Sequence, residues 1–392
     1  MEITTTGARI RRLRKLRGMT QDDLRRASRL SLRTIKDIEQ DHGNHRNQTL
    51  HAIAQALQVR TSDLNGPGEP EHQPVPGEPW EDVRAVLYRR DPAEDPAEPA
   101  TPGGVLAGLA ALMPSWRRAE YSQARLLLPG LLRDAMSLDG AEDDRAARSR
   151  VLNATAWLLT MTRQFEDGLT AGRLALDAAP GMPDTLAAVS VMAWCLLRQG
   201  RIGEAGTLAA EWADRAEPRF SRATDEELAA YGKVMQYVSV SLLRDNRPGD
   251  ADDALALARA AAARIGREVP ANASTTMTFG PAQVQVIAAE NAALRGKPDL
   301  VLAIAERLPG PGLARIEPAQ QLRHRLDVAS AHAMRRDYGN VVGVMRGLHR
   351  EAPEWLASQQ YARDILEEVI RKRRGPLGQE LRELAAATRL HV

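Results

Sequence analysis

The chain has 392 residues and a formal net charge of +2, with 43% apolar and 27% charged residues. This length allows two or three domains, and the balance is ordinary for a soluble globular protein. A single cysteine excludes an internal disulfide and a cysteine-based zinc site. Since no uninterrupted apolar run reaches about 18 residues and no signal-peptide core opens the chain, we expect a cytoplasmic protein.

Composition and charge are both biased. Alanine and leucine dominate while aromatic residues make up 4%, which favours helix. Arginine far outnumbers lysine, a bias typical of GC-rich bacterial genomes, so we expect a bacterial source. Residues 1–65 hold 13 basic and 7 acidic residues, whereas the remainder holds 40 and 44. A basic head on a mildly acidic body suggests that the head binds a polyanion.

Residues 1–65 predict five short helices. In the first, apolar residues recur at helical spacing, and basic side chains surround them. Polar residues that favour the N-cap position mark the next three helix starts. The apolar face of the first helix consists of Ile10, Leu13 and Leu16. The starts are Thr20 (helix through Ala27), Ser31 (helix to about Gln40) and Asn47 (Leu50, Ile53, Ala54 and Leu57 facing inward), and a last turn is expected over 61–64.

The second and third of these helices have the pattern of a helix-turn-helix, whose second helix must stay exposed so that its N-terminal side chains enter the major groove. The expected buried residues are Leu24, Ala27, Leu30, Ile35 and Ile38. The expected exposed residues are Leu32, Arg33, Thr34, Lys36 and Asp37.

Several of these exposed side chains are candidate DNA contacts. The fork of Arg33 matches guanine O6 and N7, Lys36 could reach a base or a phosphate, and Leu32 could pack on a thymine methyl group. Thr34, on the same exposed face, is a further candidate contact. Phosphate contacts are expected from Gln21, where a helix begins, and from Asn44, Arg46 and Asn47 in a loop. The alternative is a plain basic helical bundle with solvated arginines, but caps, spacing and charge together favour DNA binding.

This segment resembles the XRE (Cro/C1-type) family of helix-turn-helix transcriptional regulators, from "GARIRRLRKLRGMTQDDL" through "SLRTIKDIEQDHG" to "TLHAIAQALQV", about residues 7–64. The family's motif is matched at Thr20, Gln21, Ser31, Thr34, Ile35, Ile38 and Glu39. Two departures stand out. Arg25 replaces a usually small residue, and Arg29 replaces the usual turn glycine, which costs steric energy if that residue is left-handed. The resemblance implies a sequence-specific DNA-binding domain.

Residues 66–104 are expected to form a linker. They hold nine prolines and nine acidic residues, and such sequence stays extended because it buries too little apolar surface to fold. The exception is a stretch near 79–90, where Trp80, Val83 and Leu87 recur at helical spacing and predict a short helix.

Residues 105–392 repeat an apolar helix, a polar turn and a second apolar helix, and successive units start roughly 36 to 50 residues apart. Helix pairs at such a period stack into a solenoid, since one pair cannot bury its apolar face alone. We therefore predict an all-α chain with two final capping helices. The region resembles a tetratricopeptide-like (TPR-like) repeat domain. An XRE head before such repeats is similar to bacterial regulators that sense a ligand, in some cases a signalling peptide, in a groove lined by the first helix of each pair.

Candidate ligand contacts are polar residues within otherwise apolar first helices: Asn153, Gln236 and Asn291. Alternatively, these amides hydrogen-bond neighbouring helices or face solvent. We expect core roles for Trp157, Trp194, Trp212 and Met192, and a buried, small apolar role for Cys195. The chain contains none of the familiar zinc, phosphate-loop, hydrolase-elbow or dinucleotide motifs, so we predict no metal, no cofactor and no enzyme.

The first hypothesis is a cytoplasmic transcriptional regulator. It would bind a palindromic operator as a homodimer, with half-sites about 34–36 Å apart or a multiple of that. The repeats would dimerise and sense a peptide, a small molecule or a protein partner. The second hypothesis is a TPR-type interaction scaffold whose head serves only for localisation. An enzyme ranks last.

Overall fold

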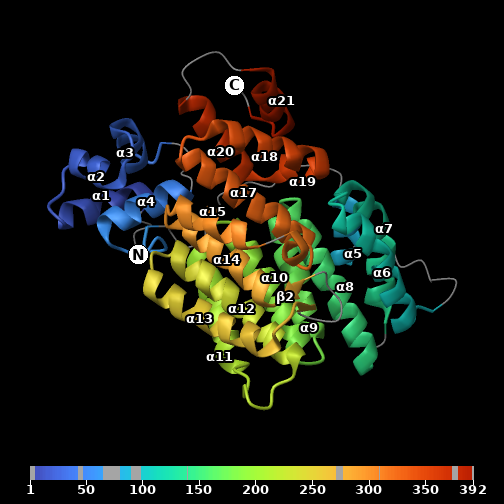
Figure 1. Ribbon diagram of the computed structural model, residues 1–392. Helices are drawn as coiled ribbons and strands as arrows, with labels where there is room; N and C mark the ends of the chain where they lie inside the picture. Colours follow the sequence, from blue (N-terminus) through green and yellow to red (C-terminus); the bar gives the residue numbers. More distant parts are fainter. Residues whose placement is uncertain are drawn as a thin grey trace.

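The computed structural model describes residues 5–42, 47–64, 80–89, 99–138, 140–270, 277–308, 310–372 and 378–390. The prediction of an all-α chain is confirmed, because helices make up most of these residues (Figure 1). Within the described ranges, β structure is confined to two short antiparallel strands, β1 (Val269–Pro270) and β2 (Thr278–Phe279), which the sequence did not predict.

The N-terminal head packs around a small apolar core that includes the fully buried Ile10, Leu24, Ile35 and Ile53. Its described helices are α1 (Thr6–Leu16), α2 (Gln21–Ser28), α3 (Leu32–Glu39) and α4 (Asn47–Leu57). The fifth predicted element is a hydrogen-bonded turn over 61–64 rather than a helix.

The predicted caps of α2 and α3 are confirmed. The hydroxyl of Thr20 accepts the Asp23 N–H at 3.1 Å, and the hydroxyl of Ser31 accepts the Thr34 N–H at 3.0 Å. Asn47, expected to precede α4, is its first helical residue.

Two predictions for the apolar face of the head are wrong. Leu16 is 72% exposed and Ala27 is exposed, whereas Arg14 and Ser28 are buried. The buried face of α1 includes Gly7 and Arg14. Helix α1 crosses α3 so closely at Gly7 that a side chain there would clash with α3. Because this crossing sets which face of α1 is buried, Leu16 lies outside that face.

The turn between α2 and α3 has the backbone strain expected for its sequence. Arg29 is left-handed, with φ 58°. A residue with a Cβ costs about 1–2 kcal/mol in this conformation relative to a right-handed one, and glycine avoids that cost.

The short helix predicted inside the linker is confirmed as α5 (Glu81–Leu87), and it packs on the body. Trp80, Val83 and Leu87 are buried, and Arg84 forms an ion pair with Asp167 at 2.8 Å. Residues 65–79 and 90–98 of the predicted linker lie outside the described residues. The next helix begins at Pro102, three residues before the expected start of the body.

The body consists of helix pairs stacked in chain order, as predicted (Figure 1). Its helices are α6 (Pro102–Arg117), α7 (Tyr121–Ser137), α8 (Glu142–Met161), α9 (Phe165–Ala178), α10 (Met182–Arg198), α11 (Ile202–Arg215), α12 (Asp225–Arg244), α13 (Pro248–Ile265), α14 (Pro281–Leu294), α15 (Pro298–Arg307), α16 (Gly310–Leu313), α17 (Pro318–Met334), α18 (Tyr338–Glu351), α19 (Pro353–Ser358), α20 (Gln360–Lys372) and α21 (Gln379–Ala387).

One turn type joins the two helices of each pair. After α6, α8, α10, α12, α14 and α17, a residue of positive φ follows the helix, and the next N–H bonds back to the carbonyl five residues earlier. Lys297 N–H to Ala292 O, at 2.9 Å, is one example. This is the Schellman arrangement, which satisfies the last carbonyls of a helix and reverses the chain tightly. The left-handed residues are Ala119, Arg163, Gly200, Asn246, Gly296 and Arg336.

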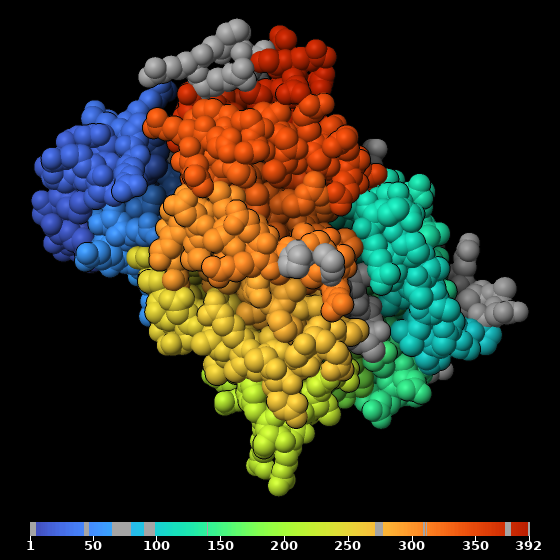
Figure 2. Space-filling model, in the orientation of Figure 1, coloured from blue at the N-terminus to red at the C-terminus, as the bar shows by residue number. Residues whose placement is uncertain are grey.

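The head forms a separate lobe that contacts the body (Figure 2). The contact is at the C-terminal end of α12, where the carbonyl of Arg244 accepts hydrogen bonds from the Thr61 hydroxyl at 2.7 Å and from His51 Nδ1 at 2.9 Å. Two further hydrogen bonds join the same segments: Ser62 N to Asp245 Oδ1 at 2.8 Å and Asn246 Nδ2 to Val59 O at 3.0 Å. These four hydrogen bonds attach the head to the end of α12.

Candidate DNA-binding surface and ligand pocket

Helix α3 presents a polar face to solvent and an apolar face to the head core. The Arg33 side chain is 91% exposed, with Nε 3.6 Å from an Asp37 carboxylate oxygen, and Lys36 is also exposed. Ile35 and Ile38 on the opposite face are buried. The start of α3 thus has the exposure that a recognition helix requires.

The other predicted contacts on α3 are less open. Leu32 is 36% exposed, and Thr34 is half-buried with its hydroxyl 2.7 Å from that of Ser31. A thymine methyl could still approach Leu32. The hydroxyl of Thr34 already forms a hydrogen bond with the hydroxyl of Ser31, the N-cap residue of α3.

A buried ion pair fixes α3 against α1. Arg14 donates from Nε and Nη2 to the two Glu39 carboxylate oxygens at 2.5 and 3.0 Å, and from Nη1 to the Met19 carbonyl at 2.7 Å. Gln21 Nε2 donates to Glu39 at 2.8 Å. One amide hydrogen of Gln21 is therefore engaged inside the head, and the phosphate contact remains a prediction for its other hydrogen.

The charge states of this pair follow from its surroundings. Burial alone would raise the pKa of Glu39, but hydrogen bonds from Arg14 and Gln21 outweigh it, and the pKa is lowered. The hydrogen bond to Glu39 raises the pKa of Arg14. Both groups are charged at neutral pH. Sequence reasoning missed the pair because Arg14 looked like one of many solvated arginines on α1.

The remaining predicted phosphate contacts lie elsewhere. Asn44 and Arg46 lie outside the described residues. Asn47 is half-buried at the start of α4, and its side chain lies against Gly200 of the body. That position argues against a phosphate contact by Asn47 while the head is docked. Exposed basic side chains also line α1 beside the end of α3, namely Arg11, Arg12 and Lys15.

A second candidate site is a cavity of about 110 Å³ in the body. It lies among first helices of successive pairs, α8, α10, α12, α14 and α17, and is bordered by α19. The resemblance to ligand-sensing regulators implied a groove lined by these first helices.

One of the three predicted ligand residues lines this cavity. Gln236 borders it, and its Nε2 atom is buried without a hydrogen-bond partner among the described residues. Asn291 instead donates to Ser239 Oγ on α12 at 2.9 Å, which is the alternative left open by the sequence. Asn153 is buried outside the lining, and neither atom of its amide has a hydrogen-bond partner within the described part of the chain.

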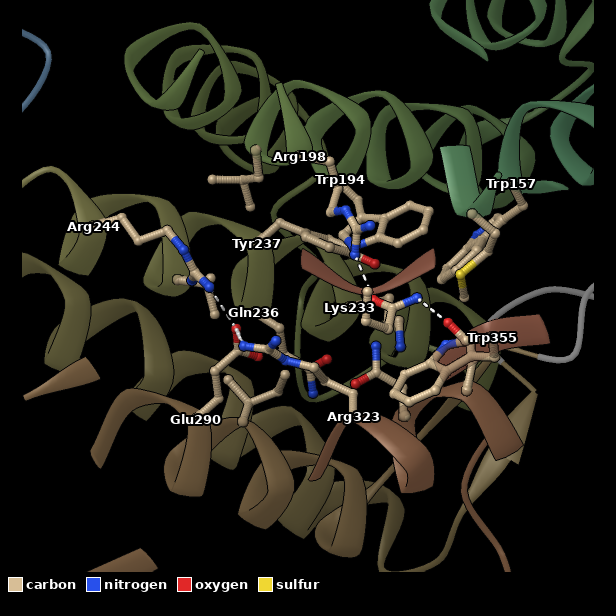
Figure 3. Close-up of a pocket in the computed structure, with 17 residues that line it drawn as sticks. Trp157, Trp194, Arg198, Lys233, Gln236, Tyr237, Arg244, Glu290, Arg323 and Trp355 are labelled. Carbon is tan, nitrogen blue, oxygen red and sulfur yellow. Dashed lines mark hydrogen bonds and ion pairs between the residues drawn. The ribbon is translucent and has the colours of Figure 1, made fainter. Parts of the chain in front are cut away.

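The cavity has an aromatic side and a charged side (Figure 3). Trp157 and Trp194 stack with ring centroids 4.2 Å apart, and Trp355 lies near them. These two rings were expected to serve the core alone, yet both line the cavity. Across from them, Glu290 accepts a hydrogen bond from Arg244 at 2.9 Å.

Two cations of the lining, the half-buried Arg198 and the buried Lys233, form no ion pair with any described carboxylate. Arg198 donates to the neutral Gln359 amide at 2.9 Å, and Lys233 Nζ lies 3.4 Å from the Thr278 carbonyl. Burial, with two neighbouring arginines, lowers the pKa of Arg198 to about 10, and burial lowers the pKa of Lys233. The sequence offered no signal for them, because their burial depends on helices from several pairs.

Cys195 is buried as expected, with Sγ 3.3 Å from the Phe165 carbonyl, and burial raises the pKa of its thiol to about 12. Among the helices of the described ranges, none combines the length and apolarity needed to cross a bilayer.

Comparison with known proteins identifies the head. Residues 9–67 match the family model of the Cro/C1-type HTH DNA-binding domain. No curated protein matches the chain. Among solved structures, PlcR of Bacillus thuringiensis, in complex with the peptide PapR7 and DNA, is similar with 11% identity and a TM-score of 0.35. The match covers 87% of this chain and 99% of that one.

A second solved structure is ComR from S. thermophilus, in complex with DNA and its signalling peptide ComS. It is similar with 10% identity and a TM-score of 0.25, over 88% of this chain and 99% of that one. Both TM-scores are low, so the likeness by itself decides nothing about this chain.

Proposed function

We propose that this chain, whose N-terminal domain is a Cro/C1-type helix-turn-helix DNA-binding domain, is a sequence-specific transcriptional regulator with a ligand-sensing body. The observation that carries the proposal is the exposed face of α3. Arg33 and Lys36 lie open to solvent there, while the buried Arg14–Glu39 pair holds the helix from behind. A rigid helix with an accessible guanidinium can read guanine in the major groove.

The DNA-bound form in this proposal is a two-fold dimer. One small head contacts few base pairs, so useful specificity needs two heads on a palindromic site. The half-sites would then be about 34–36 Å apart, or a multiple of this.

The sensing part of the proposal has a structural route through α12. The Arg244 side chain borders the cavity and pairs with Glu290, while its backbone carbonyl accepts hydrogen bonds from the head. A ligand that binds one arrangement of this helix end more tightly shifts the population of docked heads. Arg244 would then couple ligand binding to head docking, because its side chain borders the cavity and its carbonyl contacts the head.

Selection of binding sites from random DNA, followed by affinity measurements on the selected sequence, tests the regulator. We expect one palindromic motif, bound far more tightly than scrambled DNA at the same salt concentration. If the full-length protein shows no sequence preference, the regulator proposal is wrong, and the scaffold alternative, in which the head only localises the repeats, is favoured.

A further inference from the structure

We infer that the cavity in the body binds a small organic anion that carries one flat apolar ring, and that Arg198 and Lys233 hold its anionic group. This inference names the ligand class for the sensing part of the proposed function and rests on it. Its test uses ligand binding without DNA, so a failure here leaves DNA recognition untouched.

The first argument is charge. Arg198, Lys233, Arg244 and Arg323 line the cavity, and Glu290 is the only carboxylate of the described lining. Glu290 pairs with Arg244 and lies 3.4 Å from Arg323, so Arg198 and Lys233 have no direct ion pair with a described carboxylate. Lys233 is 2% exposed, and the charges of Glu317 and Glu268 offset its burial only in part, since its pKa is lowered. An anion in the cavity would compensate the remaining cost of these cations.

The second argument is unused hydrogen-bonding capacity. Four polar atoms of the lining are buried and lack a hydrogen-bond partner among the described residues. They are Gln236 Nε2, the Tyr237 hydroxyl, Arg244 Nη1 and Gln320 Oε1. Folded proteins leave few such atoms, so four around one cavity indicate a polar occupant.

The third argument is shape. Trp157 and Trp355 are almost fully buried, and Figure 3 shows them with Trp194 on the side of the cavity opposite the Arg244–Glu290 pair. Aromatic faces favour a flat apolar group. The volume of about 110 Å³ is somewhat below the roughly 150 Å³ of a cavity that accommodates benzene. One ring with a carboxylate therefore requires side chains of the lining to shift, and an extended peptide does not fit inside.

Benzoate and phenylacetate are suitable probes, with benzamide as the neutral match for benzoate and inorganic phosphate as the ring-free anion. Binding to the full chain is followed by tryptophan fluorescence and calorimetry, since three tryptophans border the cavity. We expect saturable binding of at least one aromatic carboxylate at millimolar concentration or below, and affinity at least about tenfold lower for benzamide and for phosphate.

Two variants assign the binding to this cavity. Lys233→Met and Arg198→Gln each remove one cation and should weaken aromatic carboxylate binding about tenfold or more. Arg335→Met removes an exposed arginine directly after α17, whose Nη1 lies 3.3 Å from an Asp299 carboxylate oxygen, and should change nothing. Circular dichroism checks folding, and the comparison of benzoate with benzamide on the unmodified chain needs no variant.

Four results would overturn the inference, and the first three concern aromatic carboxylates. They are no binding of any aromatic carboxylate at millimolar concentration, equal affinity for benzoate and benzamide, and carboxylate binding that folded Lys233→Met and Arg198→Gln chains retain in full. Phosphate binding as tightly as benzoate would also refute it, because the ring would then contribute nothing.

Discussion

The substitution Glu39→Gln should loosen the DNA-binding head without disturbing the body. Glu39 accepts two hydrogen bonds from Arg14 and one from Gln21, and its side chain is 2% exposed. A glutamine of the same size leaves Arg14 buried without a counter-charge. Breaking a buried ion pair on one side costs about 3–5 kcal/mol. Opening of the head should therefore become at least about a hundredfold more frequent, since 1.4 kcal/mol is a factor of ten.

Hydrogen exchange followed by mass spectrometry measures this opening in the full chain. Peptides from α2 and α3 should lose protection in Glu39→Gln, while peptides from α12 and α13 keep theirs. Asp22→Asn is the matched control, because its pair with Arg25 is exposed and such pairs contribute at most about 1 kcal/mol. If Glu39→Gln and Asp22→Asn exchange alike in α3, the buried pair does not hold the recognition helix.

The same pair predicts a pH dependence. The pKa of Glu39 is lowered in the folded head, because hydrogen bonds from Arg14 and Gln21 outweigh the effect of burial. A lowered carboxylate pKa stabilises the folded state above the unfolded pKa of about 4.3, and this stabilisation is lost as pH falls through the folded value. Protection of α3 should therefore fall in acid for the natural chain and vary less in Glu39→Gln. Equal acid sensitivity of the two chains would contradict the assignment.

Three further substitutions test other parts of the molecule. Arg33→Ala should relax preference at one operator position at a cost of about 1–3 kcal/mol, measured by affinity for a full set of single-base variants. Arg29→Gly should stabilise the head by up to about 1 kcal/mol, because glycine adopts the left-handed turn without steric cost, and slower exchange in α2 would show it. Thr61→Val should weaken head docking by about 1–2 kcal/mol through loss of the hydrogen bond to the Arg244 carbonyl, measured as faster exchange at 59–64 with unchanged protection in α3.

The parts that sequence predicted well depend on local chemistry. Thr20 and Ser31 cap their helices because the cap needs only a side-chain oxygen and an N–H three residues later. The exposed face of α3 follows from helical spacing between Ile35 and Ile38. The pairing of helices in the body was likewise visible in the repeated apolar segments and polar turns.

The parts that sequence could not predict depend on distant residues. The burial of Arg14 requires Glu39, which is far along the chain, and no local pattern shows that a carboxylate will meet it. Arg198 and Lys233 converge only after α10 and α12 pack together with α14 and α17. Most of the left-handed hairpin turns lack glycine, so their usual sequence signal is missing.

In the proposed two-fold dimer, the attachment of the head to the end of α12 would limit which operators can be bound. While these contacts hold, each recognition helix has a fixed orientation relative to its own body. The two recognition helices of a dimer therefore fit only operators whose half-sites have one rotational offset around the duplex axis. Each base pair inserted between half-sites turns one of them by about 35° around the duplex axis, since a full turn takes about 10–10.5 base pairs. Insertion of a single base pair between the half-sites should therefore lower the affinity for the operator. A docked head would thus let the protein discriminate between operators by the length of their spacer.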